Sequence, residues 1–189
     1  MGTIKTTNIE TITGSGTLTI GQSGETISVP SGATLTVPNG GLTGQNYPAF
    51  EAYLSADQTV SSAVITKVEI DTELFDTDSC YDNSVNYRFT PNVAGKYMVY
   101  TNIMIFGNGD IEDSKVYIYK NGSLYRSTTF DPVNTASAMN QANVINTAII
   151  DMNGTTDYIE SFGVVQSGGS TEFKSADKST YFGAYKIGS

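Results

Sequence analysis

The sequence lacks histidine and tryptophan altogether, and its 189 residues include one cysteine, Cys80. Without histidine the chain cannot build a Ser-His-Asp or Cys-His catalytic arrangement, a histidine metal site or a histidine-based pH switch. A single cysteine excludes an intrachain disulfide and a thiolate zinc site. These absences remove the commonest hydrolase and zinc-protein classes, so we expect a protein that binds and assembles and has no enzymatic activity.

Basic residues are also scarce, because 10 Lys and Arg stand against 19 Asp and Glu and give a net charge of -9. An acidic chain repels the polyanionic backbone of nucleic acids. Its longest apolar runs are far shorter than the roughly 20 residues that span a bilayer, and the first ten residues do not follow a secretory signal pattern. We therefore expect neither a nucleic-acid partner nor membrane insertion.

Residues 1–46 differ in composition from the rest, because 24 of them are Thr, Ser or Gly and only three are charged. A short alternating pattern recurs there at 17–20, 26–29 and 34–37, and each copy is followed by a turn that contains glycine. Alternation of apolar and polar residues is typical of a short strand, and Gly or Pro ends it. A repeat of this period indicates a repeating β-structure.

Each repeat offers only two aliphatic side chains, which is too little apolar surface to order the segment in a single chain. We therefore predict a stalk in which three chains wind around a common axis. Its predicted interior consists of the aliphatic pair of each repeat: Leu18, Ile20, Ile27, Val29, Leu35 and Val37. A disordered low-complexity tail is the alternative that this composition also permits.

From residue 47 onward the chain reads as one strand after another, separated by turns rich in Gly and Asn. Strands are predicted at 49–54, 64–70, 95–106, 115–120, 124–130, 142–152, 157–166 and 180–187. No stretch combines helical periodicity with helix caps. The pattern predicts an all-β, antiparallel jelly-roll sandwich over residues 47–189, with the β-repeat stalk over residues 1–46.

The predicted strand at 95–106 is apolar on both faces. One face carries Val99, Ile103 and Ile105, and the other carries Met98, Tyr100, Met104 and Phe106. Because a strand of an antiparallel sandwich usually has one solvated face, the second face needs a cover, and a second subunit is our first choice. Cover by the chain's own loops is the alternative. The predicted trimer interface consists of the second face and four further tyrosines: Tyr117, Tyr119, Tyr181 and Tyr185.

Aromatic and turn residues recur in a characteristic order along residues 47–189. The order is Tyr81-Asp82, Phe89, Gly95-Lys96-Tyr97-Met98-Val99, Val116-Tyr117-Ile118-Tyr119-Lys120-Asn121-Gly122, Asn153-Gly154-Thr155-Thr156-Asp157-Tyr158-Ile159 and Ser179-Thr180-Tyr181-Phe182-Gly183-Ala184-Tyr185. This order and spacing resemble the globular head of complement-1q-like proteins. The resemblance implies a ten-stranded jelly roll of the tumour-necrosis-factor superfamily and assembly as a homotrimer.

The stem of this chain differs from that of the familiar complement-1q-like proteins, which carry collagen triplets. The Thr- and Gly-rich repeats instead resemble the β-stalks of bacteriophage fibres and spikes. We therefore expect a homotrimeric virion surface protein, assembled in the host cytoplasm, whose head attaches to a host glycan or protein or decorates the capsid. The N-terminal segment is expected to bind another virion protein.

Two other functions stay open at this stage. A carboxylate-based polysaccharide depolymerase of a tail spike needs two acidic residues at catalytic separation, and the abundance of acids supplies candidates. An adhesive head on a bacterial cell surface or spore coat needs only the same trimer in another location.

Calcium is the one cofactor that the acidic stretches suggest, with Asp76, Asp78, Asp110 and Asp113 as candidate ligands. The first stretch does not complete the calcium-loop pattern, because Cys80 and Tyr81 stand where an oxygen ligand and a glycine are needed. We therefore expect no bound cofactor.

Overall fold

The computed structural model describes residues 28–34, 47–132 and 139–188. The chain divides into two units, Met1–Gln45 and Asn46–Ser189, and each is described by itself. Five predicted stalk residues lie outside the described residues: Leu18, Ile20, Ile27, Leu35 and Val37. The sixth, Val29, is 44% exposed in the single chain. The turn predicted after it is present, because the Ala33 amide donates to the Pro30 carbonyl at 3.0 Å.

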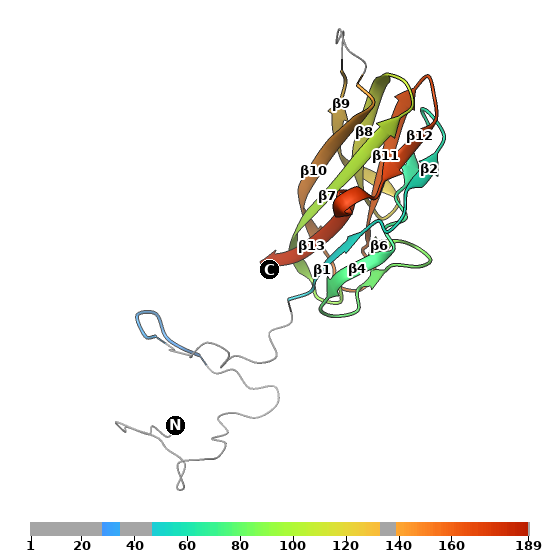
Figure 1. Ribbon diagram of the computed structural model, residues 1–189. Helices are drawn as coiled ribbons and strands as arrows, with labels where there is room; N and C mark the ends of the chain where they lie inside the picture. The colour runs from blue at the N-terminus through green and yellow to red at the C-terminus, as the bar shows by residue number, and fades with distance from the viewer. Residues whose placement is uncertain (1–27, 35–46, 133–138, 189) are drawn as a thin grey trace, which may run out of the picture. The chain divides into compact units, whose positions relative to one another are not determined.

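The described part of the second unit contains thirteen strands and one short 3-10 turn (Figure 1). They are β1 (Ala49–Tyr53), β2 (Gln58–Val60), β3 (Thr66–Lys67), β4 (Thr72–Asp76), β5 (Tyr81–Asp82), β6 (Arg88–Phe89), β7 (Gly95–Gly107), β8 (Ile111–Lys120), β9 (Ser123–Phe130), β10 (Gln141–Met152), β11 (Ile159–Ser167), β12 (Thr171–Lys174), η1 (Ala176–Lys178) and β13 (Tyr181–Gly188). Across these ranges, no helix has the length and apolar character needed to span a bilayer.

The strands form two antiparallel sheets around strand β7. In the seven-stranded sheet, β7 pairs along one edge with β10 and along its other edge with β13 and then β12. Strands β1 and β4 follow β13, and β2 follows β12. The six-stranded sheet has the order β5-β6-β11-β8-β9, with β3 also paired to β11. The predicted all-β, antiparallel sandwich is therefore confirmed.

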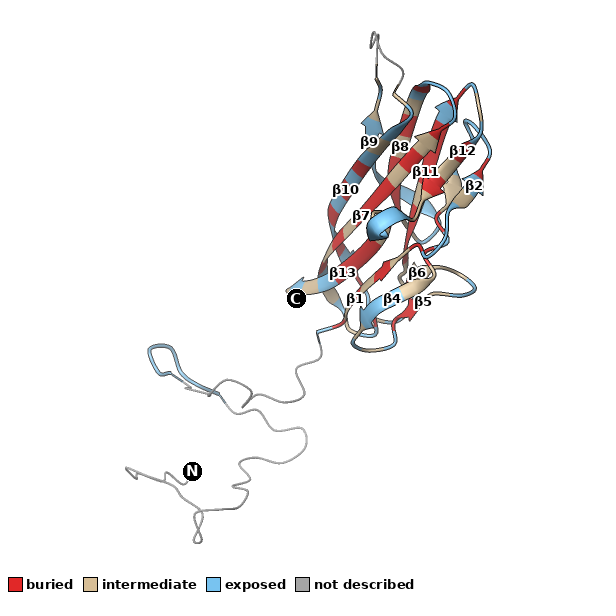
Figure 2. Cartoon of the chain, in the orientation of Figure 1, coloured by how far each residue is buried: buried red, intermediate tan, exposed pale blue. Residues whose placement is uncertain are grey.

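The core lies between the two sheets, where Figure 2 shows buried residues on the facing strands. Phe50 stacks on Tyr81 and Phe89, with ring centroids 4.4 and 4.6 Å away. The edge of Phe182 meets Phe50 at 5.1 Å, and Tyr97 lies 5.8 Å from Phe89. Each aromatic pair adds about 0.5 to 1.5 kcal/mol beyond the burial of its area. Four of these five rings belong to the residues that carry the sequence resemblance. The aromatic part of the resemblance therefore consists largely of residues that pack in the core.

Strand β7 has the two faces that its sequence predicts. Val99, Ile103 and Ile105 are fully buried in the core. Met98 and Tyr100, which alternate with them, point out of the sandwich and are only partly buried. The alternation in β7 is therefore confirmed, and its outward face is left to be covered by something outside the core.

One predicted strand is much shorter than expected, because 64–70 forms only the two-residue β3. Val68 and Ile70 are buried as an alternating strand would have them, and the Val68 amide donates to the Ser161 carbonyl at 3.0 Å. The alternation of apolar residues therefore matches the burial of Val68 and Ile70, while regular strand pairing ends after Lys67. Strands β2, β4, β5, β6 and β12 have two to five residues each and were not predicted, since so short a segment carries little periodic signal.

The Asn-Gly turns behave as their chemistry requires. Asn121 and Gly122 have φ angles of 52° and 74°, the left-handed pair that closes a two-residue hairpin between β8 and β9. Gly154, with φ of 71°, approaches the backbone of the loop before β7 so closely that a Cβ would lie 2.2 Å from the Ala94 nitrogen. Glycine is therefore required at 154 for its conformation and for the lack of a side chain.

We expect Gly154→Ala to lower the free energy of unfolding by about 2 kcal/mol or more, because a left-handed φ and a backbone clash combine. Gly168→Ala is the matched control, since a Cβ there meets no atom within 4 Å. Urea unfolding followed by circular dichroism measures both variants. Equal effects of the two substitutions would contradict the close approach at Gly154.

Candidate functional site

The candidate site is the outer face of the seven-stranded sheet, by which we mean the face turned away from the core. Residues opposite one another on antiparallel strands share a face. Ile149 of β10 and Tyr185 of β13 both lie opposite Met98 of β7. Gly183 lies opposite Tyr100 on the same face. The outer face therefore runs continuously across β10, β7 and β13.

Large apolar side chains on this face remain in contact with solvent. About half of the surface of each of these is exposed: Phe75 47%, Ile145 55%, Ile149 54% and Tyr185 47%. Together with Met98, Tyr100 and Tyr181 we call them the apolar face. Isolated exposed apolar residues are normal on a protein surface, but a contiguous group marks an interaction site.

The centre of the apolar face is built around Tyr100. A Cβ at Gly183 would lie 2.4 Å from the Tyr100 hydroxyl, so the absence of a side chain at 183 allows the Tyr100 ring to lie against β13. Tyr181 and Tyr185 flank this ring, with centroids 6.2 and 6.5 Å away. The hydroxyl donates to a carboxylate oxygen of Glu51 at 2.6 Å. Burial, followed by the bond to Glu51, raises the pKa of Tyr100, so the hydroxyl remains a donor at neutral pH.

The structure brings together six of the eight predicted interface residues and separates the other two. Met98, Tyr100, Met104, Phe106, Tyr181 and Tyr185 all belong to the seven-stranded sheet. Tyr117 and Tyr119 instead lie on β8 in the six-stranded sheet. Because Val116 and Ile118 of β8 are fully buried in the core, these two tyrosines point to the opposite side of the sandwich.

The chain itself covers one end of the outer face. The Ser179 hydroxyl donates to the Met104 sulfur at 2.8 Å, and the Lys174 ammonium lies 5.2 Å from the centre of the Phe106 ring. Cover by the chain's own residues, the alternative considered for this strand, therefore applies at Met104 and Phe106. The other end, around Met98 and Tyr185, is open.

The sequence did not reveal four members of the site. Phe75, Ile145 and Ile149 lie on strands whose position in the sheet depends on long-range pairing, and Glu51 joins them only because β1 lies between β13 and β4. The one local signal is in β10, where Ile145 and Ile149 alternate with buried Val144, Ala148 and Ile150.

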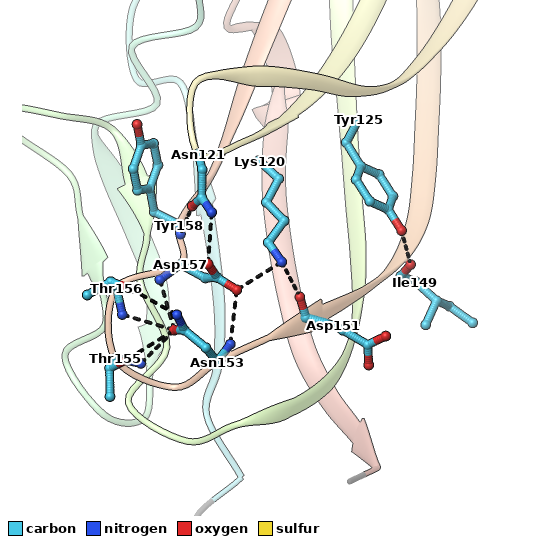
Figure 3. Close-up of polar contacts among 10 residues, drawn as sticks. All are labelled: Lys120, Asn121, Tyr125, Ile149, Asp151, Asn153, Thr155, Thr156, Asp157 and Tyr158. Atoms are coloured by element: carbon cyan, nitrogen blue, oxygen red, sulfur yellow. Dashed lines mark hydrogen bonds and ion pairs between the residues drawn. The ribbon is translucent and has the colours of Figure 1, made fainter.

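Side chains from β8 and β9 cover the free edge of β10. The carbonyls of Thr147 and Ile149 accept hydrogen bonds from Arg126 and from the Tyr125 hydroxyl, both at 3.0 Å. Lys120 donates to the Asp151 carbonyl at 2.6 Å, and Figure 3 shows this bond and that of Tyr125. An edge strand whose carbonyls are occupied is a poor template for strand addition. This border of the apolar face therefore presents side chains to a partner.

The turn between β10 and β11 is fixed by Asp157, which Figure 3 shows at the centre of a polar cluster. Its carboxylate accepts from Lys120 and Asn121, each at 2.8 Å, and from the Asn153 amide at 3.1 Å. The bond from Lys120, then that from Asn121, holds the pKa of Asp157 below its usual range. This network connects two turns into one rigid end of the sandwich.

Two of the four candidate calcium ligands, Asp76 and Asp113, are engaged in contacts within the chain. Asp76 accepts from the amides of Asp78 and Tyr81 at 3.3 and 2.8 Å, and Asp113 pairs with Lys115 at 2.9 Å. Asp78 Oδ2 is enclosed without a hydrogen-bond partner among the described residues, and Asp110 is exposed. In the part of the chain that the structure describes, no three His, Cys, Asp or Glu side chains are grouped to hold a metal ion.

The loop after β5 is shaped by Asp82. Its carboxylate accepts from the amides of Val85 and Ser84 at 2.9 and 3.1 Å and from the Asn86 side chain at 2.6 Å. The bond from the Val85 amide is the first cause that lowers the pKa of Asp82 to about 2. At the tip of this fixed loop the Val85 side chain is 77% exposed.

Comparisons with known proteins place the fold. No protein-family model matches the sequence, and no curated protein matches it. Among solved structures, Eiger TNF from S. frugiperda matches with a TM-score of 0.54 and 11% identity, over 75% of this chain and 91% of that one. Murine APRIL at pH 8.5 matches with a TM-score of 0.54 and 8% identity, over 75% of this chain and all of that one. A crystal of murine APRIL at pH 5.0 gives a TM-score of 0.52.

These likenesses define the class of the second unit as a TNF-like jelly roll. The tumour-necrosis-factor part of the sequence resemblance is therefore confirmed at the level of the fold.

We expect Asp82→Ala to lower the free energy of unfolding at pH 7 by about 1 to 2 kcal/mol, a value reduced by solvent screening. Because the carboxyl has a lowered pKa in the folded chain, its stabilisation is present above the unfolded pKa of about 3.9. It is lost as the pH falls toward about 2. The difference between variant and parent should therefore shrink over this window.

Urea unfolding at several pH values from 7 to 2 measures this difference. Asp110→Ala, which removes an exposed loop carboxylate, is the control and should change stability little at any pH. A deficit of Asp82→Ala that is the same at pH 7 and pH 2 would contradict the assignment.

Proposed function

We propose that the chain is a non-enzymatic, homotrimeric virion surface protein whose jelly-roll head attaches the particle to its host or decorates the capsid. The apolar face is the observation that carries the proposal. Ile149 and Tyr185 on this face are half-exposed. The net charge of -9 makes copies of the chain repel one another, so an exposed apolar face on such a chain marks an interaction site. The TNF-like fold and the complement-1q-like order of aromatic residues support three copies as the arrangement that covers this face.

The layout of the face supports a cyclic assembly. In the order β10-β7-β13-β1-β4, one border carries Ile145 and Ile149 and the other carries Phe75. In a closed ring each subunit meets its two neighbours through unlike surfaces. An apolar face with two different borders meets this requirement.

Rigid loops at the end of the sandwich support a role in binding. The Asp82 loop holds Val85 out in solvent, and the Asp157 network fixes the neighbouring hairpin turns. A fixed loop loses little entropy on binding, so its contacts contribute more fully to affinity. Three copies of such loops on one particle component convert a weak contact with a host glycan or protein into avidity.

The placement on a virion rests on the sequence. Thr- and Gly-rich repeats in residues 1–46, most of them outside the described residues, resemble phage β-stalks, and the segment would bind another virion protein. An adhesive head on a bacterial surface or spore coat would use the same apolar face. The depolymerase alternative has less support, because neighbouring carboxylates such as Asp57 and Glu172 are both paired with Lys174.

Ile149→Asp tests the apolar face directly. We expect the parent chain of 20.2 kDa to have about three times that mass in analytical ultracentrifugation at micromolar concentration. Ile149→Asp should have the mass of one chain, because a carboxylate would be buried in the interface. Ile65→Asp is the matched control, since Ile65 is 50% exposed but precedes β3 of the other sheet, and it should keep the parent mass.

The same proteins test attachment. The parent and Ile65→Asp should bind host cells at least about 100-fold more tightly than Ile149→Asp, because only a multivalent head has avidity. Antibody labelling of intact particles tests the virion placement. A parent chain with the mass of a single subunit, or labelling confined to the cell envelope, would overturn the corresponding part of the proposal.

A further inference from the structure

Glu51 is an unusual residue for the position it occupies. It lies on β1 between Gly183 of β13 and Phe75 of β4, on the outer face of the seven-stranded sheet. Among the described residues, its carboxylate accepts one hydrogen bond, from the neutral Tyr100 hydroxyl at 2.6 Å. A second copy that covers the apolar face would remove water from this carboxylate. A buried carboxylate is costly unless a cation pairs with it.

Three other carboxylates around the outer face already have cations within the chain. Asp151 pairs with Lys96 at 3.3 Å, and Glu172 pairs with Lys174 at 2.9 Å. Asp57 pairs with the same lysine, Lys174. Glu51 differs from these three in having only a neutral donor among the described residues.

Arg126 is the complementary residue at the opposite border of the face. It is exposed on β9, and its guanidinium donates to the Thr147 carbonyl of β10, next to the exposed Ile149. A backbone carbonyl uses only part of the five-donor guanidinium and does not neutralise its charge. Arg126 can therefore pair with a carboxylate of another subunit while it keeps its bond to β10.

Two other cations that have no carboxylate partner among the described residues are less well placed. Lys178 of η1 lies over the Tyr53 ring at 4.7 Å, on the strand that carries Glu51, and Arg88 of the six-stranded sheet stacks on Tyr158. Lys178 therefore lies near the border that carries Glu51 itself, and Arg88 lies in the other sheet, so neither is at the border opposite Glu51. Figure 1 shows β9 and β10 on one side of the head and β1 and β4 on the other.

We propose that, in the trimer, Glu51 of each copy forms an ion pair with Arg126 of the neighbouring copy. This inference rests on the proposed function, because it needs a cyclic assembly in which unlike borders of the face meet. The Arg126 fork matches a carboxylate, so the pair can be bidentate while Tyr100 continues to donate to Glu51. Three such pairs would fix the direction and register of the ring, which the apolar contacts alone leave unspecified.

Charge reversal and its rescue test the pair. The variants are Glu51→Arg, Arg126→Glu and the double variant with both substitutions. Each single variant should raise the concentration at which half of the trimer dissociates by roughly 30-fold or more, because like charges meet in a desolvated interface. The double variant should recover most of this loss, since the two charges are exchanged. Analytical ultracentrifugation over a concentration series measures all of them.

Two controls separate the pair from general effects of charge. Glu112→Arg makes the same change as Glu51→Arg, and Lys115→Glu makes a similar change from cation to acid that also removes the pair with Asp113. Both lie on β8, in the other sheet, and should dissociate like the parent. Circular dichroism checks that each variant is folded, which matters for Arg126→Glu because it also loses the bond to Thr147. The ion pair would be overturned, and the trimer would still stand, if the double variant dissociated as readily as the less stable of the two single variants. The same holds if both single variants assembled like the parent. A parent chain that is itself a single subunit would overturn the proposed function instead.

Discussion

Strand β7 has apolar side chains on both faces, and the rest of the structure depends on how both are covered. On the inner side Val99, Ile103 and Ile105 are fully buried between the two sheets, beside the aromatic cluster around Phe50. This side fixes the sandwich, because β7 is the strand to which β10, β12 and β13 all pair. Burial of each large aliphatic side chain contributes about 1.5 to 3 kcal/mol, so the inner face of β7 contributes substantially to the stability of the sandwich.

The outer side of β7 links the fold to the proposed function. Part of it is covered within the chain, where Ser179 and Lys174 contact Met104 and Phe106. The part around Tyr100 is open, apolar and organised, because Gly183 leaves room for the ring and Glu51 accepts a hydrogen bond from its hydroxyl. The side chains of this surface are already held in place for contact with a partner. The neighbouring edge of β10 is protected against strand addition by Arg126 and Tyr125. Assembly through side-chain packing of identical heads satisfies both conditions.

Much of the fold could be predicted from the sequence because its signals are local. Alternation placed β7, β9 and β10 to within a residue or so, and the spacing of Phe89 and Tyr97 indicated the jelly roll, since these rings pack together in the core. The strand predicted at 64–70 is regular only at β3, although Val68 and Ile70 are buried in alternation as far as its end. Whether a buried segment pairs with a neighbour depends on residues far along the chain, which local periodicity does not report.

The candidate site was harder to predict for the same reason. Tyr117 and Tyr119 have the composition of interface residues, but β8 belongs to the other sheet, and sheet membership is set by long-range pairing. Glu51 and Phe75 enter the site only through the register of β1 with β13 and β4. Asp76 shows that composition can also mislead, because a carboxylate predicted as a calcium ligand accepts hydrogen bonds from the backbone amides of Tyr81 and Asp78 instead.

The structure of the oligomer that the full chain forms in solution would show directly whether the apolar face is the interface between copies. We expect three copies around one axis, with the side chains of Ile149 and Tyr185 of each copy buried against a neighbour and shielded from solvent. An oligomer that leaves the outer face of the seven-stranded sheet exposed, and that assembles through the six-stranded sheet or the loops, would contradict it.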